Sequence, residues 1–85
     1  MFDATIQILV RRAGRATADS DCMQVPVSLA LGVVRADREI ARNTQVHRAV
    51  DRDGHGVRVF YTQLAGPWPG VEDITHIVTV PTAAA

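Results

Sequence analysis

The chain has 85 residues and a formal net charge of zero, because nine Arg balance nine acidic residues and Lys is absent. This length admits one domain with a modest core and excludes a two-domain enzyme with a separate cofactor fold. The balanced charge excludes a general electrostatic attraction to nucleic acid or to an acidic membrane.

The apolar residues, 47% of the chain, are mostly small: twelve Val and twelve Ala stand against four Leu, five Ile and four aromatic residues. This apolar content is typical of a folded domain. Small side chains bury less area each than Leu or Phe, so the core of a chain this short is thin. A thin core is often completed by a second subunit, and we therefore expect a homo-oligomer.

The single cysteine, Cys22, excludes a disulfide within the chain and a zinc site built from cysteines. It indicates a reducing, cytoplasmic compartment. The apolar residues 4–10 are not preceded by the basic segment of a signal peptide. Because no apolar run approaches the roughly 20 residues that span a bilayer, we expect a soluble protein without a membrane partner.

Residues 4–12 alternate apolar and polar side chains, with Ile6, Ile8 and Val10 on one face. This period of two predicts a β-strand. The alternation is lost over residues 13–24, where Gly, Ser and Asp accumulate. A loop is predicted there.

Residues 25–43 fit two interpretations. Apolar side chains occupy alternate positions over the first part, as in a strand that faces a crowded layer. At the helical period the stretch instead has an apolar stripe and an opposite charged face. The stripe consists of Leu29, Val33, Ala36 and Ile40, and the charged face of Arg35, Arg38, Glu39 and Arg42. We predict a helix for the charged half, residues 34–43, while residues 25–34 fit either structure.

Residues 44–50 and 57–64 are rich in β-forming residues, and the turn-forming residues 51–56 between them include two glycines. This arrangement predicts a β-hairpin. Residues 65–70 place two Pro and two Gly around one Trp and predict a loop.

The last predicted strand, residues 73–81, alternates again and ends at Pro81. Residues 82–85 are expected to form a frayed tail. The order β-α-β-β-β predicts one α+β domain over residues 1–81, with one helix packed on a mainly antiparallel sheet. If residues 25–34 form a strand, the alternative is an all-β sandwich or a small barrel.

The turn that contains Asp51 and Asp53 matches a calcium loop only in part. Its fifth position is His55, and its twelfth is Thr62 in place of the bidentate Glu that such loops need. The three histidines have no metal-ligand spacing, and no glycine-rich phosphate motif occurs. We therefore expect no metal and no cofactor.

His76 shares its predicted strand face with the apolar side chains of residues 74–80. An imidazole in this position is either a hydrogen-bonded core residue or an acid–base group. In an enzyme, its partners would be the adjacent carboxylates Glu72 and Asp73, at a site between subunits.

Arginines cluster at residues 11–15 and 35–42. Acidic residues are interspersed, and only Phe60 and Tyr61 offer rings for base stacking from a strand. A nucleic-acid partner is therefore not favoured.

The main candidate for recognition is Trp68. Proline on both sides fixes the backbone, so the indole is presented at low entropic cost. We expect a small molecule or a protein partner to dock there, with Tyr61 and His76 as further ligand-binding residues. The alternative is that Trp68 folds back over the thin core.

The sequence thus predicts a small homo-oligomeric binding or accessory module. The alternative is a small enzyme that uses His76 with Glu72 or Asp73. Because no nucleophile or metal motif occurs, the binding module is the preferred hypothesis.

Overall fold

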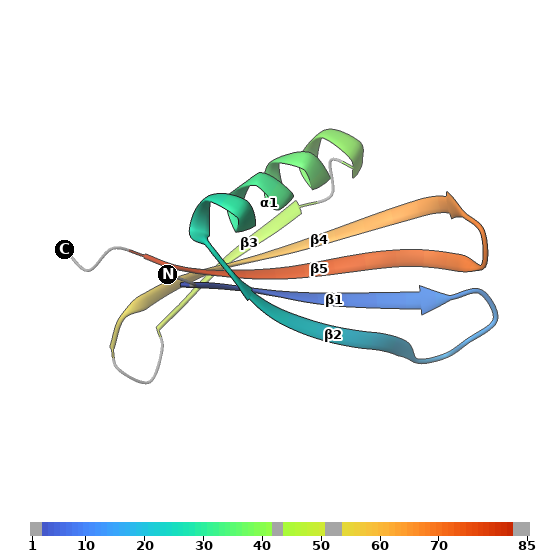
Figure 1. Cartoon of the computed structure of the whole chain (residues 1–85), viewed down its shortest axis with the longest axis horizontal. Coiled ribbons are helices and arrows are strands. Elements are labelled where there is room, and N and C mark those ends of the chain that lie inside the picture. Colours follow the sequence, from blue (N-terminus) through green and yellow to red (C-terminus); the bar gives the residue numbers. More distant parts are fainter. Residues whose placement is uncertain (1–2, 42–43, 51–53, 83–85) are drawn as a thin grey trace.

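The computed structural model describes residues 3–41, 44–50 and 54–82. It contains one helix and five strands (Figure 1). Their bounds are β1 (Ala4–Arg12), β2 (Ala18–Val25), α1 (Val27–Ala41), β3 (Thr44–Val50), β4 (Gly56–Trp68) and β5 (Val71–Pro81). The predicted α+β class, with one helix on an antiparallel sheet, is confirmed, and the all-β alternative is wrong because residues 27–41 form the helix.

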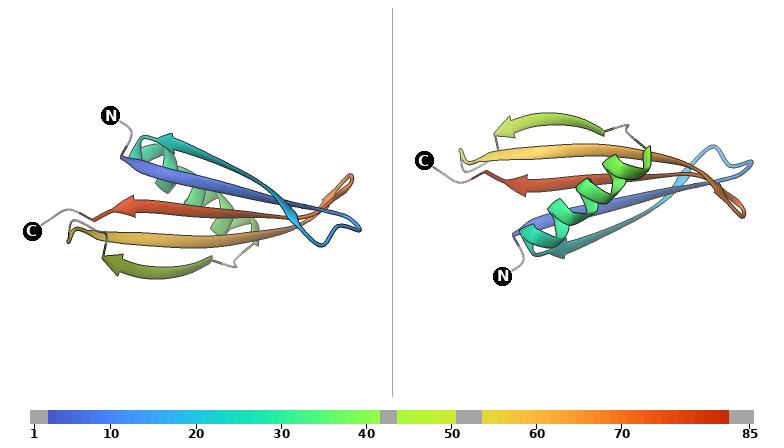
Figure 2. Two further views of the ribbon diagram at one scale, coloured as in Figure 1. Left: turned by 90° about the horizontal axis from the view of Figure 1, so that it is seen from below. Right: turned by 90° about the horizontal axis from the view of Figure 1, so that it is seen from above.

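The strands form one sheet in the order β2-β1-β5-β4-β3, and each neighbouring pair is antiparallel. Strands β2 and β3 are therefore the two edges, and α1 carries the chain from one edge to the other. Figure 2 shows that the helix crosses one face of the sheet and leaves the other uncovered. Among the described residues, no helix combines the length and the apolar content needed to span a bilayer.

The core lies between α1 and the middle of the sheet. Its buried members are small apolar residues and one aromatic: Ala4, Ile6, Val25, Ala30, Val34, Phe60, Val78 and Val80. The largest side chains that are fully buried are those of Val78 and Thr62. Since burial stabilises in proportion to apolar area, this core contributes little for a domain of this length.

The helix is rotated relative to the predicted apolar stripe. Ala30, Val34 and Asp37 face the sheet and are buried, whereas Leu29 is 54% and Ile40 69% exposed. The reason is that small Ala30 allows close approach of the backbones, while the Asp37 carboxylate binds partners on the sheet. The sequence periodicity had favoured the bulkier stripe.

Strand β2 corrects the loop that was predicted for residues 13–24. Ala18–Val25 pairs with β1 in continuous register, from Ala4 opposite Val25 to Arg11 opposite Ala18. Its side chains are exposed up to Val25, so no apolar alternation marks the strand. An edge strand of this kind depends on backbone pairing, and exposed charges are typical of it.

The loop predicted for residues 65–70 is also wrong. Strand β4 continues to Trp68, with an irregularity in pairing between Ala65 and Trp68. Only residues 69–70 form the turn, where Gly70 has a φ of 74°. Glycine supplies this conformation without steric cost, so one turn glycine suffices and the second, Gly66, lies in the strand.

The predicted hairpin of residues 44–50 and 57–64 is confirmed by the pairing of β3 with β4. In its connection, Gly54 has a φ of 81°, while Asp51 and Asp53 lie outside the described residues. Thr82 donates a backbone hydrogen bond of 2.7 Å to the carbonyl of Gly56. This bond ties the end of β5 to the start of β4; residues 83–85 of the predicted tail are outside the described part.

The β1–β2 and β4–β5 hairpins project beyond the helix (Figures 1 and 2). We call this projection, residues 11–18 and 65–73, the distal arm. Its two tips are joined by a backbone hydrogen bond of 3.1 Å from Ala13 to Gly70. The arm gives the molecule an extent of 45 × 25 × 22 Å.

Candidate functional site

A groove runs between α1 and β4 on the helix side of the sheet. It consists of a hollow of about 470 Å³ and a neighbouring hollow of about 290 Å³, which share Leu31, Arg58 and Phe60. We call both together the α1–β4 groove. Its walls are formed by Val27, Leu31, Val34, Arg35, Arg38, Glu39, Arg58, Phe60, Val80, Pro81 and Thr82.

The floor of the groove is apolar. Phe60 of β4 belongs to the core and is only 8% exposed. Leu31 extends from the helix and is 40% exposed. An apolar body could therefore displace water from Leu31 and the rim of Phe60, which is the usual source of affinity in a small-molecule site.

The rim of the groove is basic. Arg35 and Arg38 are three residues apart on α1 and are therefore neighbours on one helix face. Arg58 enters from β4, where it lies directly opposite Arg48 of β3. Like charges in opposed positions of an antiparallel pair repel each other. The fold thus concentrates positive charge at one place although the whole chain is neutral.

These arginines have no counterion among the residues that the structure describes. Within the described residues, none of Arg35, Arg38, Arg48 and Arg58 has a carboxylate within ion-pair distance. Glu39 is the one carboxylate among the described residues that line the groove. The groove therefore offers several unpaired guanidinium forks, whose geometry suits carboxylate and phosphate oxygens.

A buried polar cluster lies beside the core, at the contact of three elements. Nδ1 of His76 on β5 is 2.7 Å from Oδ2 of Asp37 on α1. The hydroxyl of Thr62 on β4 donates to the same oxygen. The side chains of Asp37 and His76 are only 5% and 18% exposed. This cluster fastens the helix to the two strands below it.

The roles in this contact depend on the imidazole tautomer. When Asp37 is ionised, its carboxylate only accepts hydrogen bonds, and Nδ1 of His76 is then the donor. In a neutral ring Nε2 is then the acceptor. Thr44 lies opposite Thr62 in the register, and its Oγ1 is buried without a hydrogen-bond partner in the described part.

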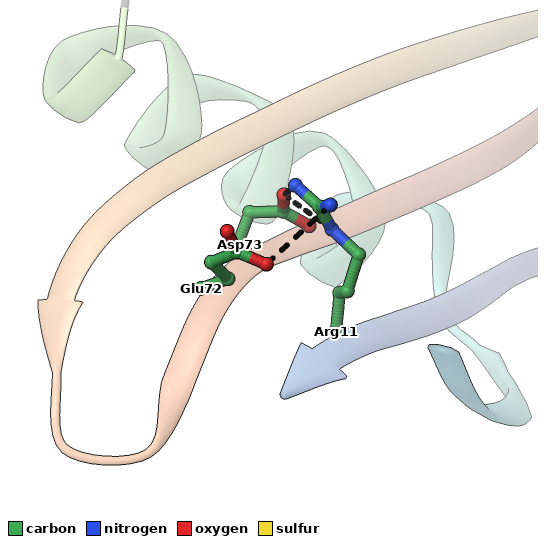
Figure 3. A network of polar contacts seen from close by, with 3 residues as sticks. All are labelled: Arg11, Glu72 and Asp73. Carbon is green, nitrogen blue, oxygen red and sulfur yellow. Dashed lines mark hydrogen bonds and ion pairs between the residues drawn. The ribbon is translucent and has the colours of Figure 1, made fainter. Parts of the chain in front are cut away.

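The carboxylates predicted as partners of His76 bind an arginine instead. Figure 3 shows Arg11 of β1 with Glu72 and Asp73 at the start of β5. Nε of Arg11 donates to Oδ2 of Asp73 at 3.0 Å, and its Nη1 is 3.4 Å from Oε2 of Glu72. These hydrogen bonds hold the pKa of Asp73 below its usual value and raise that of Arg11. The trio links the two hairpins of the distal arm.

The three residues predicted to bind a ligand are not brought together. Tyr61 lies on the uncovered face, where its ring meets that of His47 edge to face at 5.1 Å. His76 lies next to it in the register but on the helix side, bonded to Asp37. Trp68 is seven residues further along β4, roughly 23 Å at the usual rise of a strand.

Trp68 lies close over the backbone of Gly66. A Cβ placed on Gly66 would be 1.8 Å from Cε3 of the indole. The ring is half-buried at the end of the distal arm, and neither hollow of the α1–β4 groove is lined by it. The indole thus packs on its own strand at the end of the distal arm, and Trp68 is not among the described residues of the core that the alternative prediction had it cover.

The single cysteine and the described acidic and histidine residues form no further site. Cys22 is exposed on β2, and no cluster of three or more His, Cys, Asp or Glu that could hold a metal occurs in the described ranges. The groove itself was missed because Arg58 comes from a strand that carried no motif. Its signal was the presence of Arg48 and Arg58 on opposite sides of the predicted hairpin turn; the register then places them directly opposite each other.

Comparison with known proteins adds no relative: no protein-family model, no curated protein and no solved structure matches the chain. The geometry of the site is therefore the basis for any functional assignment.

Proposed function

We propose that this chain is a binding module and that its ligand is a small amphiphilic anion held in the α1–β4 groove. The observation that carries the proposal is the presence of Arg35, Arg38 and Arg58, without counterions in the described part of the chain, around the apolar floor of Leu31 and Phe60. The larger hollow, about 470 Å³, falls in the volume range of ordinary small-molecule sites.

The energetics favour an anionic head group and an apolar body. Arg48 and Arg58 repel each other across the strand pair, so an anion between the groove arginines relieves repulsion as well as forming charge-assisted hydrogen bonds. The apolar part of the ligand would cover Leu31, which is otherwise 40% exposed. Carboxylates and phosphates share the head-group chemistry that guanidinium groups recognise.

The test uses three eight-carbon probes: octanoate, octyl phosphate and uncharged octanol. Titration is followed by isothermal calorimetry and by thermal unfolding, because a ligand that binds the native state raises the unfolding temperature. We expect at least one anion to bind with one site per chain and octanol to bind much more weakly. Binding should weaken with salt, since the attraction is electrostatic.

Variants locate the site. Arg58→Gln should weaken binding of the anion about tenfold or more, because a charge-assisted hydrogen bond contributes about 1.5–3 kcal/mol. Arg15→Gln removes the same charge in the turn between β1 and β2, outside the groove, and should leave affinity unchanged. Equal binding of octanol and octanoate, or equal loss in both variants, contradicts the proposal.

Catalysis at His76 is the second candidate, and the contact of its Nδ1 with Asp37 favours it. Because Glu72 and Asp73 are bound to Arg11, the acid–base pair in this candidate is His76 with Asp37. His76 lines neither hollow of the groove. Binding therefore remains the function that the geometry supports best.

A further inference from the structure

The face of the sheet opposite α1 has an unusual composition. Figure 2 shows this face without a helix in front of it. The register places there the odd-numbered residues of β1, β3, β4 and β5 and the even-numbered residues of β2, with Leu9, Val59 and Ile77 at the centre. Hydroxyl and amide side chains surround them: Thr5, Gln7, Gln45, Gln63, Thr75 and Thr79. We call this surface the open face.

The open face is electrically neutral. Among its described strand residues, the groups charged at neutral pH are Arg11 and Asp73, which neutralise each other at one end. Asp21 lies opposite Ile8, and Arg58 lies between Arg48 and Val80, so these strand charges are on the helix side. A face meant to stay in water would normally carry charged side chains, whereas a face to be buried cannot hold unpaired ones.

We propose that the open face packs against the same face of a second copy of this chain, forming a two-fold dimer of sheets. Two identical neutral surfaces do not repel each other. Thr and Gln side chains each donate and accept hydrogen bonds, so they can pair with their own copies across a two-fold axis. The open face has no opposite charges that could pair with a strongly charged partner surface.

The area is sufficient for such a dimer. The strands have seven to thirteen residues. With about 4.8 Å between strands and 3.3 Å per residue, the five strands present on the order of 700 Å² per copy. Standard protein interfaces bury about 800 Å² per partner. Leu9, Val59 and Ile77 would then join a second apolar layer, which supplements the thin core between helix and sheet.

The inference is independent of the proposed ligand. The α1–β4 groove lies on the helix side, so the dimer would leave two grooves exposed on its outer surfaces. A protein that binds octanoate but stays monomeric therefore contradicts the dimer alone. A dimer that binds no anion contradicts the groove proposal alone.

The test measures mass by sedimentation equilibrium from about 1 to 300 µM, for the full chain and three variants. We expect a dimer that dissociates on dilution and whose affinity is nearly independent of salt. Tyr61→Glu adds a charge on the open face at a residue that is 38% exposed. Gln7→Glu adds one with almost no change of shape. Each should raise the dissociation constant on the order of a hundredfold, because the interface would bury an unpaired carboxylate.

Ile40→Glu is the matched control. Ile40 is 69% exposed on the helix, so the same new charge there should leave the dimer intact. Circular dichroism checks that every variant keeps its fold. A chain that is monomeric at every concentration overturns the proposal. An oligomer that dissociates at high salt also overturns it, because that result would indicate pairing between edge strand β2, which carries Asp19 and Asp21, and edge strand β3, which carries Arg48. An oligomer that is disrupted by Ile40→Glu alone overturns it as well.

Discussion

Asp37 holds the helix to the sheet through a single carboxylate oxygen. Oδ2 accepts from the Thr62 hydroxyl and from Nδ1 of His76, and the residue is only 4% exposed. A buried carboxylate is costly unless such donors surround it. Loss of either donor should therefore destabilise the fold by more than the loss of an exposed hydrogen bond.

Thr62→Val tests this network because valine keeps the shape of threonine and removes the donor to Asp37. We expect the free energy of unfolding to fall by about 1–3 kcal/mol. Thr44→Val is the matched control on the neighbouring strand, since the Thr44 hydroxyl is buried without a partner in the described part. It should be neutral or stabilising in urea unfolding experiments. Equal losses in both variants would refute a special role for the Asp37 oxygen.

The ion pair of Arg11 with Asp73 gives a pH-dependent contribution to stability. The Arg11 hydrogen bond lowers the pKa of Asp73 from its ordinary value of 3.8. The folded state therefore binds fewer protons than the unfolded state in this range, and stability rises with pH. The contribution is fully present above the ordinary pKa and is lost as the pH falls through the lowered one.

Asp73→Asn should therefore destabilise the protein near pH 7 and lose this effect on acidification. Urea unfolding of both proteins at several pH values between about 7 and 2.5 gives the difference in free energy. Asp19→Asn removes an ion pair with Arg12 in which the Asp19 side chain is 75% exposed, and should change stability little at any pH. A difference for Asp73→Asn that stays constant down to the lowest pH would contradict the assignment.

At the scale of elements, substitution of glycine by alanine should have opposite effects on stability at Gly32 and at Gly66. A Cβ on Gly32 in α1 meets nothing within 4 Å, so Gly32→Ala should stabilise the helix by about 1 kcal/mol. A Cβ on Gly66 in β4 would collide with the Trp68 ring. Gly66→Ala should destabilise by about 1–3 kcal/mol and shift the fluorescence of Trp68, the single Trp of the chain. Identical signs for the two variants would exclude this geometry.

Strands β1 and β5, which have a more buried and a more exposed side, were predicted from the alternation of their side chains. Strand β3, whose side chains are mostly exposed, and most of β4 were predicted from β-forming residues on both sides of a turn. The side chains of strand β2 are exposed as far as Val25. Its sequence therefore does not alternate between apolar and polar residues. The helix presents apolar residues on two sides, and periodicity alone could not decide whether Leu29 or Ala30 faces the sheet.

The candidate site depends on how the helix and the strands are placed against one another, which cannot be predicted from the sequence pattern. Arg35 and Arg38 were recognised as neighbours on a helix because helical spacing is local. Their proximity to Arg58 requires α1 to cross β4, and the contact of Asp37 with His76 requires the same crossing. Both are contacts between segments distant along the chain, fixed by tertiary packing.

At the scale of the whole molecule, the neutral net charge separates into three regions. In the described ranges, arginines without counterions line the α1–β4 groove, paired charges join the hairpins of the distal arm, and the open face has little charge. Such segregation lets one small sheet use its two faces differently. The helix side carries the basic groove that we propose binds an anion, and the open side carries the neutral surface that we propose is buried in a dimer.

If the open face is the dimer interface, the stability of the whole molecule depends on its concentration. The thin core, whose largest fully buried side chains are Val78 and Thr62, gains the interface only in the dimer. The unfolding temperature should therefore rise by several degrees between about 10 and 300 µM, by mass action. Tyr61→Glu should remove this concentration dependence, while its response to octanoate stays unchanged because the groove lies on the other side of the sheet. Scanning calorimetry of both proteins, with and without octanoate, separates the two effects. A concentration dependence that persists in Tyr61→Glu would mean that another surface joins the copies.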